Sequence, residues 1–554
     1  MDRPWLKFYE PGVPHHIQYP DVPLDRLLDR AVRDFPGREA VVFHGRKITY
    51  RELGEEVARA ASGLAQKGLR KGQRMAIMLP NCPQYVAAYY AILKIGGIVV
   101  NVNPMYVERE LEFQLRDAGV EMILALRDYY QRLQAVKEAV SLKTIILTDL
   151  DETDAERRIP KSGAAAAGEV CDYSELLDMG RRLPPPVVEV DPGEVAVLQY
   201  TGGTTGFSKG AMLTHRNLIA DVFQCVSWNR DAVRGQERML AVLPFFHAYG
   251  MTVAMNEAIE LGATIILLPR FNVDDALEAI NLYRPTRFPG VPTMYMAIMN
   301  HPQIHKYNVS SIRVCSAGSA PMPVEAQKRF EELTGAKISE GYGLTEASPV
   351  THANPFLGKR KIGSIGLPRP DVDSKIVDLE TGEKDLASGE VGELCIRGPQ
   401  VMLGYWNRPD ETSKTLRNGW LYTGDIAYMD EEGYFYVVDR KKDMIICSGY
   451  NVYPREIEEV LYQHPKIQEA CALGVPDPYR GETVKVFVVL KEKQQATPEE
   501  IIEYCQRNMA KYKVPTSVEF RLELPKSNVG KVLRKVLREE EMKKSSDHPS
   551  TSSR

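Results

Sequence analysis

The sequence predicts an α/β protein with a large N-terminal domain of doubly wound mixed sheets plus a β-barrel-like subdomain, and a small α+β C-terminal domain. Three observations lead to this prediction. Short apolar runs alternate with amphipathic runs through the first half of the chain, as in strand–helix–strand units. From Gly389 the pattern changes to closely spaced strands and turns. After Asp439 a short segment carries strand and helix patterns of its own.

The first strand–helix–strand unit begins with the apolar run MAIML at residues 75–79. We expect a helix at 83–93 after it and a second strand at 98–102. Repetition of this unit implies a parallel sheet with right-handed crossovers. The rhythm continues with a helix at 107–118, a strand at 122–126, a strand at 264–268, a helix at 273–283, a strand at 311–316 and a helix at 324–333.

We place a domain boundary at Asp439, because the elements after it form a separate βαβ-like group. This boundary divides the chain into a large domain at 1–438, a small C-terminal domain at 439–544 and a polar, disordered tail at 545–554. The expected elements of the small domain lie at 457–462, 470–474, 484–490 and 498–509, with a basic helix at 532–544.

The composition is that of a globular protein of 554 residues, with 44% hydrophobic residues and a formal net charge of only −4. So small a charge predicts no recruitment of nucleic acid. The longest apolar stretch, at 86–102, is interrupted by Lys94, Gly96 and Gly97, and a membrane span needs about 20 apolar residues. The eight cysteines show no CxxC spacing, which favours reduced thiols in a cytoplasmic protein. A homodimer and transient contact with the inner face of the membrane stay open.

The strongest local signal is the run YTGGTTGFSKG at residues 200–210, which follows an apolar strand at 195–199. Glycines permit close backbone approach, and the N–H groups and hydroxyls of such a loop can bind phosphate oxygens. The run is not a Walker A loop, because Ser208 precedes Lys209 and Gly210 follows it. Taken alone, these residues fit a phosphate-binding loop and a flexible surface turn equally well.

Six further motifs follow this loop in order: PFFHAYG at 244–250, GSAPM at 318–322, EGYGLTE at 340–346, YTGD at 422–425, DRKKDMI at 439–445 and PKSNVGKVLR at 525–534. Together they resemble the adenylate-forming superfamily of acyl-CoA synthetases, firefly luciferase and peptide-synthetase adenylation domains. The resemblance covers all but the polar tail and is greatest to bacterial medium- and long-chain fatty-acid–CoA ligases.

This resemblance implies an ATP-dependent ligase that joins a fatty acid to AMP, releases pyrophosphate, and then transfers the acyl group to coenzyme A. ATP, Mg²⁺ and coenzyme A as co-substrate are therefore expected. Alternatives are an aryl-acid ligase or an acyl-AMP ligase with the same ATP site, a carrier protein's pantetheine as acceptor, and a non-catalytic acyl-binding homologue. The last is disfavoured, because Glu346, Asp425, Arg440 and Lys531 are all present.

The ATP/AMP site implied by the resemblance combines the loop with residues of four later motifs. Tyr342 is expected to stack on adenine, and Glu346 to bind Mg²⁺ with Thr201 or Thr204. Asp425 is expected at the ribose, and Arg440 at the same ribose or at the α-phosphate. The full set is Thr201, Gly202, Gly203, Thr204, Thr205, Gly206, Lys209, Ser319, Ala320, Pro321, Glu340, Gly341, Tyr342, Gly343, Leu344, Thr345, Asp425, Arg440 and Lys442.

Three residues are implied as catalytic: Lys531, Glu346 and His247. Lys531 is expected to bridge the acid's carboxylate and the α-phosphate, because two anions must approach each other. His247 is expected to guard the approach of the carboxylate, although a core histidine with a satisfied hydrogen bond would also fit. Without the family match, basic residues such as Lys442 and Lys531 would read as ordinary surface charge.

The acyl pocket is expected to contain His247, Tyr249, Met251, Gly318 and Gly343. Acetate-specific relatives have a tryptophan where this chain has Gly343, so the pocket is expected to be open. Free amino acids are disfavoured, because the segment 245–249 has no aspartate for the ammonium group. Aryl acids stay open.

The coenzyme A site is expected at Ser448, Gly449 and Tyr450, where the glycine would let the pantetheine arm pass. The resemblance makes Asp439 the hinge about which the small domain moves between the two half-reactions. One departure is Cys447, which stands where several relatives have a lysine. A contact to phosphate or coenzyme A is therefore absent here or made by another residue.

Overall fold

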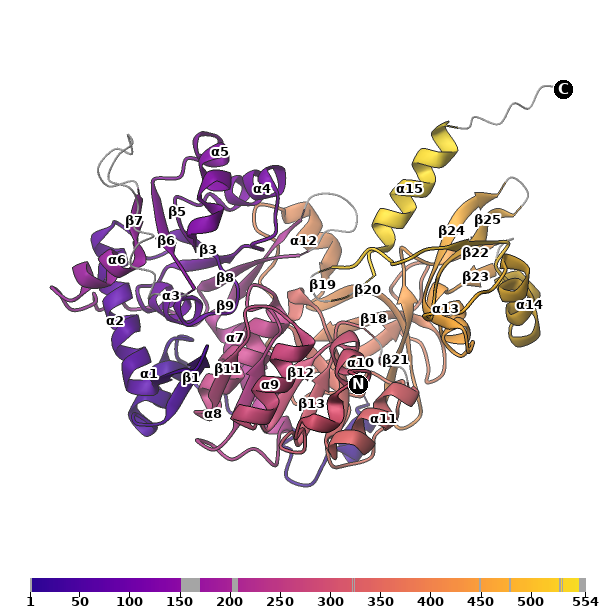
Figure 1. Cartoon of the computed structure of the whole chain (residues 1–554), viewed down its shortest axis with the longest axis horizontal. Coiled ribbons are helices and arrows are strands. Elements are labelled where there is room, and N and C mark those ends of the chain that lie inside the picture. The colour runs from indigo at the N-terminus through magenta and orange to yellow at the C-terminus, as the bar shows by residue number, and fades with distance from the viewer. Residues whose placement is uncertain are drawn as a thin grey trace. The chain divides into compact units, whose positions relative to one another are not determined.

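The structure is a computed structural model, and it describes residues 2–150, 170–201, 208–320, 322, 324–447, 450–477, 480–527, 530 and 532–547. The chain divides into two compact units. Unit 1 comprises 1–373 and 396–421, and unit 2 comprises 374–395 and 422–554. Figure 1 labels the helices and strands along the chain. The predicted α/β class, with mixed sheets in a large part and a smaller C-terminal part, is confirmed.

The first sheet of unit 1 has seven strands in the order β7-β6-β5-β3-β4-β8-β9. Every neighbouring pair is parallel except β8 and β9, which run antiparallel because a short loop joins them directly. The strands are β3 (Arg74–Met78), β4 (Ile98–Asn101), β5 (Met122–Leu126), β6 (Thr144–Thr148), β7 (Val170–Asp172), β8 (Val195–Tyr200) and β9 (Gly210–Thr214).

Alternate residues of these strands point into two different cores, as the two-residue strand period requires. Met75 and Ile77 of β3 join one core with helices α2 and α3, whereas Ala76 and Met78 join another with α4 and α5. Figure 1 shows α4 and α5 together beside β5. A sheet covered on both faces explains why its strands read as continuous apolar runs. These helices are α2 (Tyr50–Gln66), α3 (Pro83–Lys94), α4 (Glu108–Ala118) and α5 (Tyr130–Val140).

The second sheet of unit 1 has nine strands in the order β16-β15-β14-β13-β12-β10-β11-β1-β2. Its centre is parallel from β14 to β1, and its outer pairs are antiparallel. The strands are β1 (Glu39–Phe43), β2 (Arg46–Thr49), β10 (Arg238–Ala241), β11 (Thr264–Leu267), β12 (Arg287–Gly290), β13 (Val314–Ala317), β14 (Lys337–Gly343), β15 (Val350–Ala353) and β16 (Leu367–Pro368).

Helix α3 packs in the same core as strands of both large sheets, and every residue from Pro83 to Leu93 is buried. A helix that is apolar all round belongs in a core of this kind. None of the helices in the described ranges combines the length and apolar character that a membrane crossing needs. The other helical elements of unit 1 are η1 (Pro4–Phe8), α1 (Arg26–Asp34), η2 (Arg127–Tyr129), α6 (Tyr173–Gly180), α7 (His215–Trp228), the π-helical η4 (Gly250–Asn256), α8 (Glu257–Leu261), α9 (Val273–Tyr283), α10 (Pro292–Met299), η5 (Ile304–Lys306), α11 (Val324–Thr334), η6 (Thr345–Ala347) and α12 (Pro409–Thr415).

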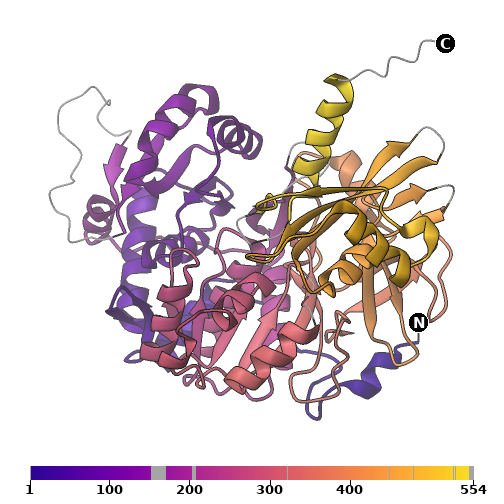
Figure 2. The ribbon, with the colours of Figure 1, turned by 45° about the vertical axis from the view of Figure 1, so that its right-hand side comes forward.

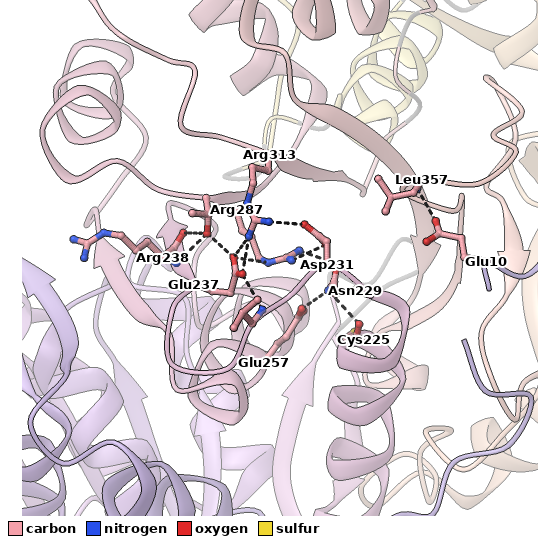
Figure 3. A network of polar contacts seen from close by, with 12 residues as sticks. Glu10, Cys225, Asn229, Asp231, Glu237, Arg238, Glu257, Arg287, Arg313 and Leu357 are labelled. Carbon is pink, nitrogen blue, oxygen red and sulfur yellow. Dashed lines mark hydrogen bonds and ion pairs between the residues drawn. The ribbon is translucent and has the colours of Figure 1, made fainter. Parts of the chain in front are cut away.

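A buried ion-pair network joins the C-terminal end of α7 to the nine-stranded sheet (Figure 3). Arg287, only 4% exposed in its side chain, donates to Glu237 (3.1 Å), Asp231 (2.9 Å) and Asn229 (2.9 Å). The amide of Asn229 donates in turn to Glu257 at 2.5 Å. Buried charges need such partners, and the network therefore fixes α7 against β12.

The strand-rich segment predicted from Gly389 forms a five-stranded sheet in which β21 also pairs with β20. Strands β20 and β21 are joined by a hairpin turn with the sequence DEEGY at 430–434, closed by the Gly433 N–H donating to the Asp430 carbonyl at 3.0 Å. Its strands are β17 (Asp373–Val377), β18 (Gly392–Arg397), β19 (Leu416–Arg417), β20 (Trp420–Met429) and β21 (Phe435–Arg440).

The C-terminal part of unit 2 contains a second five-stranded sheet, visible with its helices in Figure 2. Helices α13 and α14 pack on one face of β24 and β25, and Leu537 of α15 packs on the other. Helix α15 continues to Asp547, three residues into the predicted tail. The elements are β22 (Ile445–Cys447), β23 (Tyr450–Val452), α13 (Pro454–Tyr462), β24 (Ile467–Asp477), β25 (Gly481–Leu490), α14 (Pro498–Asn508), η7 (Lys511–Lys513), β26 (Ser517–Phe520) and α15 (Arg534–Asp547).

Candidate active site

The predicted phosphate loop connects β8 to β9 at the edge of the seven-stranded sheet. Its base is closed by a hydrogen bond from the Thr201 N–H to the Lys209 carbonyl, at 2.9 Å. The antiparallel pair therefore holds Thr201 opposite Lys209 and presents both at the same end of two strands. Of the predicted loop residues, Gly202, Gly203, Thr204, Thr205 and Gly206 lie outside the described part of the chain.

A tyrosine that sequence analysis did not single out contacts two of the predicted site residues. The hydroxyl of Tyr405 donates to Oε1 of Glu346 at 2.7 Å, and the ammonium of Lys209 lies 4.7 Å from the centre of the Tyr405 ring. Lys209 also pairs with Glu411 at 2.9 Å. Burial, followed by the adjacent Glu346 charge, raises the pKa of Tyr405, so its hydroxyl stays protonated.

The backbone holds Tyr405 in this place by hydrogen bonds to β9 and η6. The Trp406 N–H donates to the Gly210 carbonyl (2.8 Å), and the Met402 N–H donates to the Glu346 carbonyl (2.8 Å). Segment 402–406 thus bridges the strand that leaves the phosphate loop and the turn that carries Glu346. The predicted residues Lys209 and Glu346 are brought together by unit 1 alone.

The predicted adenine wall comes from two neighbouring parallel strands. Gly318, Ser319 and Ala320 follow β13, and Glu340–Gly343 end β14, with Ala317 paired to Glu340. Since the carboxyl ends of parallel strands meet at one sheet edge, the two motifs lie side by side there. Ser319 has a positive φ of 67°, which turns the chain sharply after the strand. Pro321 lies outside the described residues.

Gly343 sits where β14 and β15 approach each other too closely for a side chain. A Cβ at this position would lie 2.0 Å from the Pro349 carbonyl oxygen and 3.0 Å from Cα of Val350. The strand register also shifts between Tyr342 and Gly343. The predicted role of Gly343 in opening an acyl pocket stays a prediction, and the local backbone supplies a separate reason for glycine. Leu344 and Thr345 continue the turn into η6.

Buried polar groups hold the turn at 345–350 from behind. Asp221 of α7 is fully buried, and its Oδ2 accepts the Val350 N–H at 3.2 Å. The Thr252 hydroxyl donates to the Ser348 carbonyl at 2.6 Å. Burial raises the pKa of Asp221 to about 8, an effect that the charge of Arg369 partly opposes.

The segment that carries His247 is held by buried side chains of the seven-stranded sheet and α3. Gln199 donates to the Phe246 carbonyl (2.8 Å), Tyr85 donates to the Phe245 carbonyl (2.9 Å), and Asn81 accepts from the Phe245 N–H (2.8 Å). His247 itself is partly buried, and its Nδ1 accepts the Tyr249 N–H at 3.3 Å. This network positions the histidine's backbone without burying its ring completely.

The other predicted acyl-pocket residues gather next to this segment. Cβ at Gly318 would lie 3.2 Å from the Tyr249 ring, whose hydroxyl donates to the Ser316 carbonyl at 2.7 Å. Met251 lies in the π-helical η4, fully buried, and its sulfur accepts from Asn101 at 3.4 Å. Tyr249 and Gly318 therefore lie together close to the predicted adenine wall, whereas Met251 packs in the core that contains α3.

In unit 2, the two residues predicted for the ribose are paired across adjacent strands. Asp425 of β20 lies opposite Arg440 of β21, and Arg440 Nε lies 3.1 Å from Asp425 Oδ1. Two residues on, Lys442 keeps an exposed surface. Desolvation of its ammonium, followed by the nearby Arg440 charge, lowers the pKa of Lys442 to about 8.

Asp439, the predicted hinge, is buried at the end of β21 and accepts two backbone N–H groups, from Arg440 (2.7 Å) and Arg455 (2.8 Å). Tyr450 begins β23 and pairs with Cys447 of β22. The predicted coenzyme A residues Ser448 and Gly449 and the predicted catalytic Lys531 lie outside the described residues.

The oxygen donors of Glu346 and Thr201 have the chemistry that suits a Mg²⁺ ion bound to substrate phosphates. Mg²⁺ usually takes one or two protein carboxylates, with phosphates and water completing its octahedron. Glu346 offers one carboxylate, and Thr201 offers a hydroxyl at the base of the same loop that carries Lys209. Within the described ranges, no group of three or more His, Cys, Asp or Glu side chains could hold a metal ion.

The paired sheets, the β8–β9 loop and the carboxylate at its side define an AMP-binding, acid-activating type of enzyme. The chain belongs to the AMP-binding enzyme family, whose model matches residues 28–406, and the AMP-binding enzyme C-terminal domain matches residues 456–531. The predicted membership of the adenylate-forming superfamily is therefore confirmed.

The particular relatives agree with this class. A long-chain-fatty-acid–CoA ligase of Bacillus subtilis (strain 168) is 46% identical over 550 residues, covering 97% of this chain and 98% of the relative. The crystal structure of the anthranilate CoA ligase AuaEII with anthranoyl-AMP has a TM-score of 0.85 and 26% identity, covering 95% and 98% of the two chains. O-succinylbenzoate coenzyme A synthetase (MenE) from Bacillus subtilis, with ATP and magnesium ion, has a TM-score of 0.78 and 29% identity, covering 92% and 99%.

Proposed function

We propose that this protein is a long-chain fatty-acid–CoA ligase that forms AMP. It joins a fatty acid to the α-phosphate of ATP, releases pyrophosphate, and transfers the acyl group from acyl-AMP to coenzyme A. The structural observation that carries the proposal is the group of Lys209, Tyr405 and Glu346 beside the closed base of the β8–β9 loop. The similarity along the whole chain to a long-chain-fatty-acid–CoA ligase supports the choice of substrate.

The first half-reaction needs positive charge, because a carboxylate must attack a phosphate that is already negative. Lys209 supplies one such charge at the base of the loop, and we assign Lys531 to the acid carboxylate and the α-phosphate. Glu346 and Thr201, or Thr204, would hold Mg²⁺. When bound, Mg²⁺ neutralises the charge that develops on the leaving pyrophosphate.

The remaining nucleotide contacts follow from the positions of the other motifs. Tyr342 and the residues around Gly318 receive the adenine at the edge shared by β13 and β14. We assign the Asp425 carboxylate to the ribose hydroxyls, a contact that would exchange its ion pair with Arg440 for hydrogen bonds to substrate. Lys442 adds charge for the phosphates.

The acyl chain is proposed to lie against Tyr249, Met251 and Gly318, with Gly343 leaving the entrance open and His247 at the carboxylate. Each buried CH₂ contributes about 0.8 kcal/mol, so an apolar site of sufficient depth favours long chains. For the second half-reaction we assign Ser448, Gly449 and Tyr450 to coenzyme A, and Asp439 to the hinge between a domain at 1–438 and one at 439–544.

Lys531→Ala tests the assignment of the two half-reactions. The variant should lose acid-dependent pyrophosphate release by several orders of magnitude while still converting added palmitoyl-AMP and coenzyme A into palmitoyl-CoA. Lys535→Ala is the matched control, because Lys535 is a lysine of α15 that pairs with Glu539 and is 44% exposed. Normal pyrophosphate release by the Lys531 variant would contradict the assignment.

The substrate is tested with acetate, palmitate and benzoate, scored for pyrophosphate release and for thioester formation. Palmitate should give the highest kcat/KM, whereas a preference for benzoate would favour the aryl-acid alternative. Thioester formation on coenzyme A, rather than on a carrier protein's pantetheine, identifies the acceptor.

We also propose a cytoplasmic location with transient contact at the inner face of the membrane, and a homodimer. Flotation with phospholipid vesicles and light scattering test these two proposals.

A further inference from the structure

We propose that Tyr405 is a positioning residue for the ATP-activating group, because it holds the carboxylate of Glu346 with its hydroxyl and the ammonium of Lys209 with its ring. The inference rests on the proposed function, since it concerns how that site binds Mg²⁺ and ATP. It goes further in assigning a role to a residue outside all the motifs that identify the family resemblance.

The hydroxyl of Tyr405 is aimed at one oxygen of the carboxylate only. It donates to Oε1 of Glu346 at 2.7 Å, and a carboxylate can only accept. This hydrogen bond orients the carboxylate plane and leaves Oε2 available for a cation. Partners of this kind fix the orientation of metal-binding side chains, and their loss typically weakens metal affinity about 10- to 100-fold.

The ring of the same tyrosine lies under the ammonium of Lys209, 4.7 Å from the ring centre, within the usual range of a cation–π contact. Glu411 of α12 pairs with the ammonium at 2.9 Å. Lys209 is therefore held between the ring and Glu411 before any nucleotide binds. The phosphates of ATP can replace Glu411 as the anionic partner while the ring contact is kept.

Tyr405 can act in this way because its own position is fixed. Its side chain is buried, with 6% exposure, and its N–H donates to the Thr412 hydroxyl at 2.9 Å. The residues on both sides of it are hydrogen-bonded to β9: the Met212 N–H donates to the Gly404 carbonyl (2.8 Å), and the Trp406 N–H donates to the Gly210 carbonyl (2.8 Å). These hydrogen bonds fix the backbone of Tyr405 against β9, and burial restricts the movement of its ring.

The test is Tyr405→Phe, which removes the hydroxyl and keeps the ring. ATP binding is measured by calorimetry at several Mg²⁺ concentrations, in the absence of fatty acid, so that no turnover is needed. We expect the Mg²⁺ concentration required for half-maximal ATP binding to rise about 10-fold or more. Tyr405→Leu, which also removes the ring, should in addition weaken the Mg²⁺-independent part of ATP binding.

Tyr173→Phe is the matched control, because the Tyr173 hydroxyl also donates to a glutamate, Glu56 Oε1, at 3.1 Å, away from the loop. If both Phe variants melt at lower temperature but neither changes the Mg²⁺ dependence, Tyr405 is merely structural and the inference is overturned. In a Glu346→Gln background, Tyr405→Phe should cause no further change in Mg²⁺ dependence. If Glu346→Gln itself leaves that dependence unchanged, the proposed role of Glu346 fails, and the inference fails with it. If Glu346→Gln changes the Mg²⁺ dependence of ATP binding but Tyr405→Phe does not, the inference about Tyr405 is overturned and the proposed role of Glu346 stands.

Discussion

Replacement of the buried Asp221 by asparagine should make the protein more stable than the wild type in alkaline solution. The carboxyl group of Asp221 is fully buried behind the turn that carries Glu346, and only its Oδ2 has a hydrogen-bond partner within the described residues. Asp221→Asn keeps an oxygen that can accept the Val350 N–H, but it cannot ionise. At low pH the acid and the amide are closely matched, because both are uncharged and each places a donor group where Oδ1 now lies, an O–H in the acid and an NH₂ in the amide.

The size of the effect follows from the pKa. Burial raises the pKa of Asp221 from 3.8 to about 8, so the folded state binds the proton more tightly than the unfolded state does. The contribution of this carboxyl group to the free energy of unfolding of the wild type is therefore fully present below about pH 4. It is lost as the pH rises to about 8. Four pKa units correspond to at most about 5 kcal/mol. For a unit of about 400 residues, this amounts to a melting-temperature difference of up to about 6 °C.

Thermal melting of wild-type protein and Asp221→Asn between about pH 5 and pH 9 measures this difference. The melting temperature of the variant, relative to that of the wild type, should increase as the pH rises and become constant above about pH 8. Asp178→Asn is the control, because Asp178 is 65% exposed on α6 and its substitution should have little effect at any pH. Parallel melting curves for wild type and Asp221→Asn across this range would refute the reasoning.

Three further perturbations have defined outcomes. Gly343→Ala should lower the melting temperature and reduce the free energy of unfolding by about 1–3 kcal/mol, because its Cβ would overlap the Pro349 carbonyl. An unchanged melting temperature with an altered preference for acyl chain length would instead support a role in the acyl pocket. ATP affinity should fall as the pH rises through about 8, since Lys442 then loses its charge, and Lys442→Met should remove that part of the slope in calorimetric titrations. Arg287→Met should lower the free energy of unfolding, measured in urea, by about 3–5 kcal/mol, because it leaves the buried Glu237 without one of its cations. A decrease below about 1 kcal/mol would show that the network does not stabilise the protein.

The sequence was a good guide wherever local periodicity decides the structure. The predicted helix at 273–283 has the observed bounds of α9, and the predicted strand at 122–126 has those of β5. The strand predicted at 311–316 instead runs from Val314 to Ala317, because the chain still turns at Ser310 and Ser311, where the Asn308 side chain accepts the Ser310 N–H at 3.1 Å. The apolar pattern alone does not show where this turn ends.

The site was predictable in its motifs but not in its supporting residues. Gly318 and Glu340 could be assigned together only through the family resemblance, and the parallel pairing of β13 and β14 supplies the physical reason. Tyr405 was not predicted, since it meets Glu346 across 59 residues of sequence and belongs to no periodic pattern. Asp221 was not predicted either, because α7 is buried on most sides and its sequence does not show which polar residue supports the neighbouring turn.

The central claim is that the carboxylate of a fatty acid attacks the α-phosphate of ATP at this site. Palmitate labelled with heavy oxygen in its carboxylate, incubated with enzyme, Mg²⁺–ATP and coenzyme A, tests it directly by mass spectrometry of the products. One labelled oxygen should appear in AMP, because the bond broken by coenzyme A lies between the acyl carbon and that oxygen. Label in pyrophosphate, or formation of ADP and phosphate in place of labelled AMP, would contradict the account.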